Sequence, residues 1–199
     1  MNNMWDERYM AEEYRFGKEP NVFFKAVLDT LDPGKILIPA AGEGRDAVYA
    51  ATKGWEVHAF DLSSVGREKA LKLATEKGVS INYAVLDANN FSFPPAEYDA
   101  IALIYLHMPS EFRQWFHSRL PACLKLGGLL FLEAFNPKQL PNSSGGPKDI
   151  DLLMTPEILK SDFKDLITGR CYELTTDLDE GAYHRGTAEI VRYTGRRVV

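Results

Sequence analysis

The stretch from Lys35 to Ser63, KILIPAAGEGRDAVYAATKGWEVHAFDLS, decides the fold of this chain. It holds an apolar run, a turn with two glycines, a helical pattern and a second apolar run that ends in Asp61. Short continuous apolar runs are typical of parallel strands that are buried on both faces of a sheet. The stretch therefore predicts one strand–turn–helix–strand unit, in which the two strands are parallel.

The same alternation of strands and helices continues along the chain. Pro156 at a helix start and two alternating segments around Asp179-Glu180-Gly181 then predict a late helix and a β-hairpin. We expect a single α/β domain of Rossmann-like, doubly wound type, whose mostly parallel sheet ends in an antiparallel hairpin strand. The expected strands are 36–39, 56–60, 81–86, 98–105 and 128–135, and the expected helices include 5–14, one after Pro20, 45–53, 64–77 and 110–123.

Composition narrows the class of protein. The 199 residues are 45% hydrophobic, carry a formal net charge of -5 and contain two cysteines, Cys123 and Cys171, without a CxxC motif. An acidic chain lacks the basic face that nucleic-acid binding needs, so DNA and bulk RNA are poor partners. No apolar run approaches a membrane span, and no disulfide framework or metal cluster is indicated. We expect a cytoplasmic protein.

The glycine turn predicts a binding site for an adenosine-type cofactor. A P-loop is excluded, because Gly44 is followed by Arg45-Asp46 and not by Lys-Ser or Lys-Thr. Gly42-x-Gly44-x-x-Ala47 matches the dinucleotide fingerprint, and Asp61 ends the next strand, where a ribose-binding acid belongs. The alternative is a tight turn that uses glycine for purely structural reasons.

Two features favour an adenosyl group without a second nucleotide. Asp87-Ala88-Asn89 follows the third expected strand, where a carboxylate and an amide can meet the adenine amino edge. Trp5, Tyr9, Tyr14 and Phe16 precede the sheet, where aromatic rings can attract a cationic sulfonium. A nicotinamide-dependent dehydrogenase of the short-chain type needs a Tyr-x-x-x-Lys pair late in the fold. The two such pairs in this chain, Tyr14/Lys18 and Tyr49/Lys53, both lie too early in the sequence for that role.

Five segments together resemble class I S-adenosylmethionine-dependent methyltransferases, in the branch of the tellurite-resistance and thiopurine enzymes. The segments are WDERYMAEEYRFGKEP, HAFDLSSVGREKA, LDANNF, GGPKDIDLLMTPEIL and LDEGAYHRGTAEIVR. The resemblance implies one methyltransferase domain over 1–199, with 1–19 as an N-terminal helical lid. In the commonest form of the family's first motif an acid stands at the position of Ile38. The thiopurine branch, which this chain resembles, also has a proline at the position of Pro39.

The resemblance also implies roles for single residues. His184 is implied as a proton acceptor and Arg185 as an anion clamp, with His107 as a third catalytic candidate. Adjacent strand residues point to opposite faces, so at most one of His184 and Arg185 enters the site unless Gly186 marks a bulge. The residues expected at the cofactor are Trp5, Tyr14, Phe16, Ala40, Gly42, Gly44, Arg45, Asp61, Leu62, Asp87, Ala88, Asn89 and Tyr105.

Structural alternatives remain for several of these residues. Asp61 could cap the following helix, unless Ser63 does so, and Asp87 could cap a turn. The function implied by the resemblance is in-line methyl transfer from S-adenosylmethionine to a small molecule, either a thiol or a chalcogen oxyanion such as tellurite. A non-catalytic S-adenosylmethionine sensor and a nicotinamide-dependent oxidoreductase are the alternatives, and the oligomeric state is open.

Overall fold

The computed structural model describes residues 4–198, and its strands form a seven-stranded mixed sheet in the order β3-β2-β1-β4-β5-β7-β6. The pairs β1–β2, β2–β3 and β4–β5 are parallel, whereas β7 is antiparallel to both β5 and β6. The expected α/β fold, with a mostly parallel sheet and an antiparallel end, is confirmed. The strands are β1 (Lys35–Pro39), β2 (Glu56–Asp61), β3 (Asn82–Val85), β4 (Tyr98–Ile104), β5 (Leu124–Phe135), β6 (Ile167–Asp179) and β7 (Arg185–Arg196).

The residues gather into two compact units. The first unit runs up to Phe91 and includes Glu180–Tyr183, and the second comprises Ser92–Asp179 and the residues from His184 onward. The helices of the first unit are α1 (Met4–Tyr9), α2 (Val22–Leu28), α3 (Arg45–Thr52) and α4 (Ser64–Glu76). Those of the second are α5 (Ser110–His117), α6 (Leu120–Cys123) and α7 (Pro156–Asp162).

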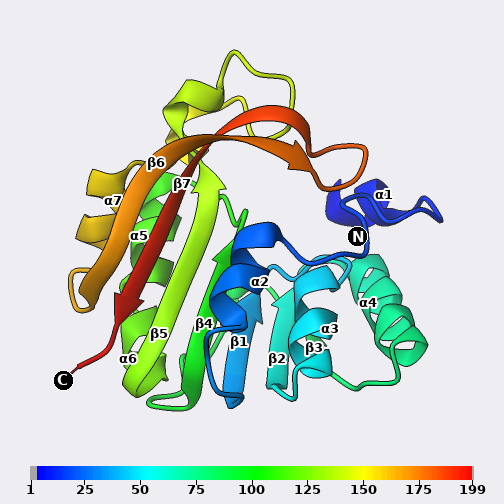
Figure 1. Cartoon of the computed structure of the whole chain (residues 1–199), viewed down its shortest axis with the longest axis horizontal. Coiled ribbons are helices and arrows are strands. Elements are labelled where there is room, and N and C mark those ends of the chain that lie inside the picture. The colour runs from blue at the N-terminus through cyan, green and yellow to red at the C-terminus, as the bar shows by residue number, and fades with distance from the viewer. Residues whose placement is uncertain (1–3, 199) are drawn as a thin grey trace. The chain divides into compact units, whose positions relative to one another are not determined.

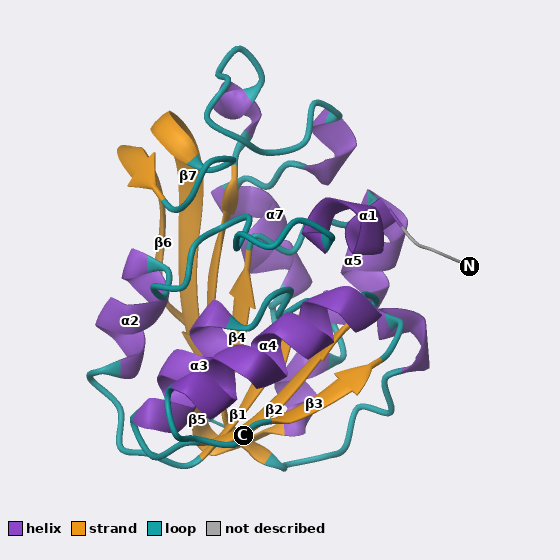
Figure 2. Cartoon of the chain, turned by 90° about the vertical axis from the view of Figure 1, so that its right-hand side faces the viewer, coloured by secondary structure: helices purple, strands orange, loops and turns teal. Residues whose placement is uncertain are grey.

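In the first unit, α3 and α4 lie side by side along β1, β2 and β3 (Figure 2). Their apolar faces form a small core in which Val48 of α3 packs with Leu73 and Ala74 of α4. Tyr14 packs against this core from the N-terminal segment. Each helix follows a strand and precedes the next one, so the end of β1 and the start of α3 meet in the glycine turn.

In the second unit, β6 and β7 form a long antiparallel hairpin (Figure 1), and α7 packs against both strands. Phe135 at the end of β5 forms a core cluster with Leu178 and Ile190 of the hairpin. Leu153 joins it from the segment that precedes α7. The hairpin expected around Asp179-Glu180-Gly181 is therefore present.

Two of the expected helices differ from the observed ones. The helix expected at 5–14 is wrong beyond Tyr9: α1 ends there, and the Tyr9 carbonyl accepts from the Lys69 ammonium at 3.4 Å. The helix expected at 110–123 is broken: α5 ends at His117, and α6 begins at Leu120 with proline in its first turn. Pro121 lacks an N–H and cannot continue the hydrogen-bond ladder of α5. Within residues 4–198, no helix combines the length and the apolar character that crossing a membrane requires.

Candidate functional site

The turn between β1 and α3 needs glycine at two positions for different reasons. Gly42 has φ +54, and a Cβ there would lie 2.8 Å from the hydroxyl of Tyr9. Gly44 has φ +86, and a Cβ there would lie 2.4 Å from Cβ of Ala70 in α4. Gly44 therefore permits close packing of the turn on a helix, whereas Gly42 leaves room for a polar atom to approach the backbone. Ala40 also has a positive φ, +51, which is uncommon for a residue with a side chain.

Asp61, at the end of β2, is bonded to this turn. Its Oδ2 accepts from the N–H of Gly42 at 3.0 Å, and its Oδ1 accepts from the N–H of Ser63 at 2.9 Å. Ser63 caps α4, since its Oγ accepts from the N–H of Gly66, so the possibility that Asp61 is that cap is wrong. Only 7% of Asp61 is exposed, and burial raises the pKa of its carboxyl group. A carboxylate offers about four acceptor positions, so Asp61 retains capacity for hydroxyl donors.

Two buried tyrosines complete the surroundings of the turn. Sequence reasoning counted Tyr9 among the N-terminal aromatic residues expected near the cofactor, but it did not place Tyr83 in the site. Tyr83 donates its hydroxyl to the carbonyl of Gly42 at 2.6 Å, and the Tyr9 hydroxyl lies over the same glycine. Burial raises the pKa of both phenols above the usual value, so both remain neutral. Tyr83 carried no distinguishing signal, because one aromatic residue on a buried strand is usually part of the core.

Glu43 and Lys69 fasten residues 10–21, which we call the strap, to the glycine turn. Oε2 of Glu43 accepts from the N–H of Arg15 at 2.7 Å, and Oε1 pairs with the Lys69 ammonium at 2.5 Å. The same ammonium donates to backbone carbonyls at the end of α1 and in the strap, those of Tyr9, Ala11 and Glu13. The strap is therefore held by charged groups of the first unit that lie next to the expected cofactor turn.

The N-terminal aromatic residues are packed into the first unit in different ways. Trp5 stacks on Tyr9 with ring centroids 5.5 Å apart. Tyr14 donates its hydroxyl to the carbonyl of Lys69 at 2.8 Å, and the carbonyl of Phe16 accepts from Arg45 at 3.0 Å. These contacts place Tyr14 on the domain core, which was the alternative to a lid. Contact of Trp5, Tyr14 or Phe16 with a cofactor stays a prediction.

The residues after β3 form a short capped turn. Oδ1 of Asp87 accepts from both the backbone N–H and the side-chain amide of Asn89, at 2.9 and 2.8 Å. The turn cap suggested as an alternative for Asp87 is thus present, and Asn89 is exposed while Ala88 is half-buried. Leu62 is 45% exposed, which is unusual for a leucine directly after a buried strand. Contact of these four residues with adenine stays a prediction.

In the second unit, two aromatic rings from different elements pack against His184. The His184 ring packs edge-on against Tyr105, which follows β4, at 4.7 Å between centroids, and against Phe135 at 5.4 Å. The His107 ring stacks on Phe135 at 5.7 Å. Tyr105 has a φ of +52, and strained conformations of this kind cluster at functional sites. We call Tyr105, His107, Phe135 and His184 the aromatic–histidine cluster.

His107 is held in one tautomer by backbone groups. Its Nδ1 lies 2.7 Å from the carbonyl of Leu152, and because a carbonyl can only accept, Nδ1 carries the proton. The N–H of Phe135 points to Nε2 at 3.5 Å. Burial lowers the pKa of His107 to about 4, and the neighbouring His184 adds to this shift. His107 is therefore neutral at physiological pH.

The structure separates the adjacent residues His184 and Arg185. His184 is 7% exposed, whereas the Arg185 side chain is 75% exposed and lies 3.5 Å from the exposed Asp179 carboxylate. Gly186 has φ +102 but pairs in register with Leu178, so the ladder continues without a bulge there. Only His184 joins the cluster, and it lies outside the strand, because β7 begins at Arg185.

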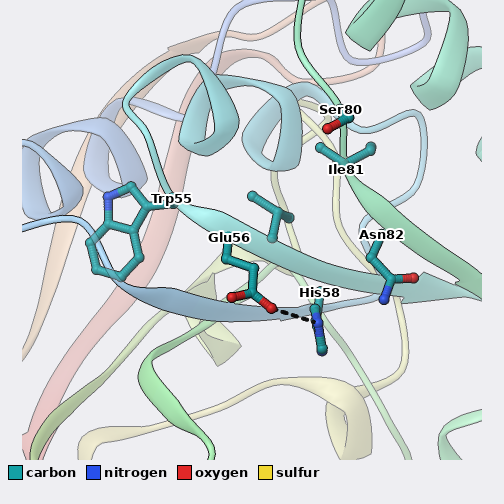
Figure 3. Close-up of a pocket in the computed structure, with 7 residues that line it drawn as sticks. Trp55, Glu56, His58, Ser80, Ile81 and Asn82 are labelled. Carbon is teal, nitrogen blue, oxygen red and sulfur yellow. Dashed lines mark ion pairs between the residues drawn. The ribbon is translucent and has the colours of Figure 1, made fainter.

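A surface hollow of about 380 Å³ lies at the amino ends of β2 and β3 (Figure 3). It is lined by Trp55, Glu56, Val57, His58, Ser80, Ile81 and Asn82, and Glu56 pairs with His58 at 3.4 Å. Asp61 ends the same strand β2, three residues or roughly 10 Å beyond His58, at 3.3 Å per residue. The hollow is therefore separate from the predicted site residues of the first unit.

Comparisons with known proteins give the family context. Residues 36–128, which include the glycine turn, Asp61 and Asp87, match the model of a methyltransferase domain. No curated protein matches the chain by sequence. A structure reported for the conversion of a disulfide bond into a thioacetal group during echinomycin biosynthesis is similar with a TM-score of 0.78. Its identity is 16%, over 98% of this chain and 91% of that one.

Two further structures share the fold at low identity. TehB from Haemophilus influenzae has a TM-score of 0.73 and 16% identity over 89% of this chain, which spans 62% of TehB. A geranyl diphosphate methyltransferase in complex with GPP and sinefungin has a TM-score of 0.66 and 17% identity, over 88% and 78% of the two chains. Residues 36–128 thus match the methyltransferase-domain family, and the chain has the Rossmann-like fold of the methyltransferases to which it is similar.

Proposed function

We propose that this protein is a methyltransferase that uses S-adenosylmethionine and acts on a small molecule. The observation that carries the proposal is the bond from Gly42 to Asp61, which joins the glycine turn to the acid of β2 inside the segment that matches a methyltransferase domain. S-adenosylmethionine is the cofactor. When bound, it supplies a methyl group on a sulfonium, which is a good leaving group.

The first unit offers suitable groups for such a cofactor. The Gly42–Gly44 turn would bring backbone groups to the methionine part, and the remaining acceptor positions of Asp61 would take the ribose hydroxyls. Leu62 would supply apolar surface to the adenine, with Asp87 at its polar edge. Gly42 fits this role because the space that its Cβ would fill already lies against a hydroxyl group, that of Tyr9.

For the acceptor, the aromatic–histidine cluster favours a thiol over an oxyanion such as tellurite. Arg185, the anion clamp implied by the resemblance, is exposed and lies near Asp179, and neutral His107 offers no positive charge. In the proposed reaction His184 would take the proton of the thiol, while the bound cofactor would supply the methyl group, so that the products would be a thioether and the demethylated cofactor. The tellurite-resistance branch stays a prediction.

Calorimetric titration followed by a transfer assay tests this function. We expect S-adenosylmethionine and S-adenosylhomocysteine to bind and NAD not to bind; preferential NAD binding would replace the proposal with an oxidoreductase. Labelled methyl transfer is then measured with a panel of small thiols and with tellurite and selenite. Binding of S-adenosylmethionine without transfer to any acceptor would favour a non-catalytic sensor.

A further inference from the structure

The tip of the late hairpin, Glu180–Tyr183, is part of the first unit, although the strands on either side of it are not. Glu180 is 9% exposed and makes charged and polar contacts there. Its Oε2 accepts from the Arg45 guanidinium at 2.9 Å, and its Oε1 accepts from the side-chain amide of Asn21 at 2.8 Å. A carboxylate that is buried at this depth needs such partners, because burial without them is costly.

Both partners of Glu180 connect to elements that the proposed function uses. Arg45 is the first residue of α3, directly after Gly44, and its second contact is to the carbonyl of Phe16 in the strap. Asn21, at the end of the strap, caps α2 through the N–H of Phe24. Glu180 therefore lies between the residue that follows the glycine turn and the residue that ends the strap.

The backbones of the tip and the strap also fit closely together. A Cβ on Gly181 would lie 2.6 Å from the carbonyl oxygen of Arg15 and 2.8 Å from the nitrogen of Gly17. The Arg15 guanidinium lies over the Tyr183 ring, 3.3 Å from its centroid, in a cation–π contact. The N–H of Arg15 is in turn bonded to Glu43 of the glycine turn.

From these contacts, we propose that Glu180 is a positioning residue that joins the hairpin tip and the strap to the glycine turn, so that the three segments are ordered together. The inference rests on the proposed function, because the glycine turn is the expected cofactor site. Its consequence is that Glu180, which touches no reacting atom, controls how well the turn is prepared for the cofactor. A cofactor that orders the turn should also order the strap and the tip.

The test is hydrogen exchange of the whole protein, measured with and without S-adenosylhomocysteine, for the wild type and Glu180→Gln. Glutamine keeps the shape and one acceptor oxygen but removes the charge that faces Arg45. Without ligand, we expect exchange in the strap and the tip to rise about tenfold in the variant, while α4 is unchanged. Affinity for S-adenosylhomocysteine, measured by calorimetry, should fall about tenfold.

Glu76→Gln is the matched control. Glu76 pairs with Lys18 of the strap at 2.6 Å, but both side chains are well exposed, so loss of this pair should change little. A double variant, Arg45→Gln with Glu180→Gln, should raise strap exchange by less than the two single variants combined, because both single variants lose the same Arg45–Glu180 ion pair. Arg45→Gln alone also loses the bond to the Phe16 carbonyl.

The outcomes separate the two proposals. If the wild type does not bind S-adenosylhomocysteine, the proposed function is wrong, and with it the role of Glu180 in preparing a cofactor site. If the wild type binds and Glu180→Gln keeps the same affinity and the same strap exchange, the positioning role is wrong and the function stands. A rise in exchange that equals that of Glu76→Gln would also overturn the inference.

Discussion

The backbone N–H of Gly42 donates to Oδ2 of Asp61 over 3.0 Å, while Oδ1 of the same carboxylate accepts from Ser63. The acid expected to bind ribose therefore also holds the glycine turn closed and fixes the start of α4. The same carboxylate stabilises the turn and is the predicted ligand of ribose, so we expect a change at Asp61 to alter both stability and cofactor affinity.

Replacement of Asp61 should affect both properties. In Asp61→Ala, the N–H groups of Gly42 and Ser63 lose their acceptor, and the free energy of unfolding should fall by about 1–3 kcal/mol. Affinity for S-adenosylhomocysteine should fall about tenfold to a hundredfold in a protein that remains folded. Asp61→Asn keeps one acceptor oxygen and should lose less stability. Urea unfolding and calorimetry measure the two effects; unchanged affinity in both variants would remove Asp61 from the cofactor site.

Gly44 of the turn should respond differently from a control glycine. In Gly44→Ala, the new Cβ clashes with Ala70 at 2.4 Å and the residue keeps a positive φ, so we expect a loss of roughly 2–4 kcal/mol. Gly78 has φ +69, and a Cβ there would meet no described heavy atom within 4 Å. The free energy of unfolding of Gly78→Ala should therefore fall by about 1 kcal/mol, from backbone strain alone. Urea unfolding compares them, and equal losses would show that packing on α4 does not select Gly44.

The adjacent residues His184 and Arg185 should differ in their effect on methyl transfer. His184→Ala removes the proposed proton acceptor from the aromatic–histidine cluster, and the transfer rate should fall about a hundredfold or more. Arg185→Ala changes an exposed side chain and should leave transfer to thiols nearly unchanged. The assay uses the thiol and oxyanion panel, with cofactor affinity measured separately. Full activity of His184→Ala would direct attention to Tyr105.

Stability should depend on pH through His107. Burial lowers its pKa in the folded state to about 4, whereas the unfolded chain has a value near 6.5. As the pH falls through 6.5, the unfolded state binds a proton first, so this contribution to stability is present above pH 6.5 and lost toward pH 4. Between pH 7 and 5, the loss from His107 should be about 2 kcal/mol.

His107→Asn isolates that contribution, because asparagine keeps a donor for the carbonyl of Leu152 but does not titrate. Urea unfolding at pH 7 and pH 5 should show a smaller loss in the variant than in the wild type. A residual loss is expected, since burial also lowers the pKa of His117. An identical pH dependence of both proteins would show that His107 titrates normally.

The sequence by itself determined the order of elements and the kind of fold. Short apolar runs alternating with helical patterns indicate parallel strands, and this information is local, because each strand and helix is encoded by consecutive residues. Local chemistry also offered Ser63 as an alternative cap of α4 and predicted a helix start at Pro156, and the structure contains both. The glycine turn with Asp61 downstream predicted the cofactor region for the same reason.

Only the tertiary structure decided which side chains support that region. Tyr83, Lys69 and Glu180 are separated from the glycine turn by 25 residues or more in sequence, and each reaches it or a neighbouring residue through a long-range contact. No periodicity encodes such contacts, since they depend on how separate elements pack. The end of α1 was misjudged for the same reason: the Lys69 ammonium of α4 donates to the carbonyl of Tyr9, the last residue of α1, and to carbonyls of the strap, and no local pattern encodes these contacts.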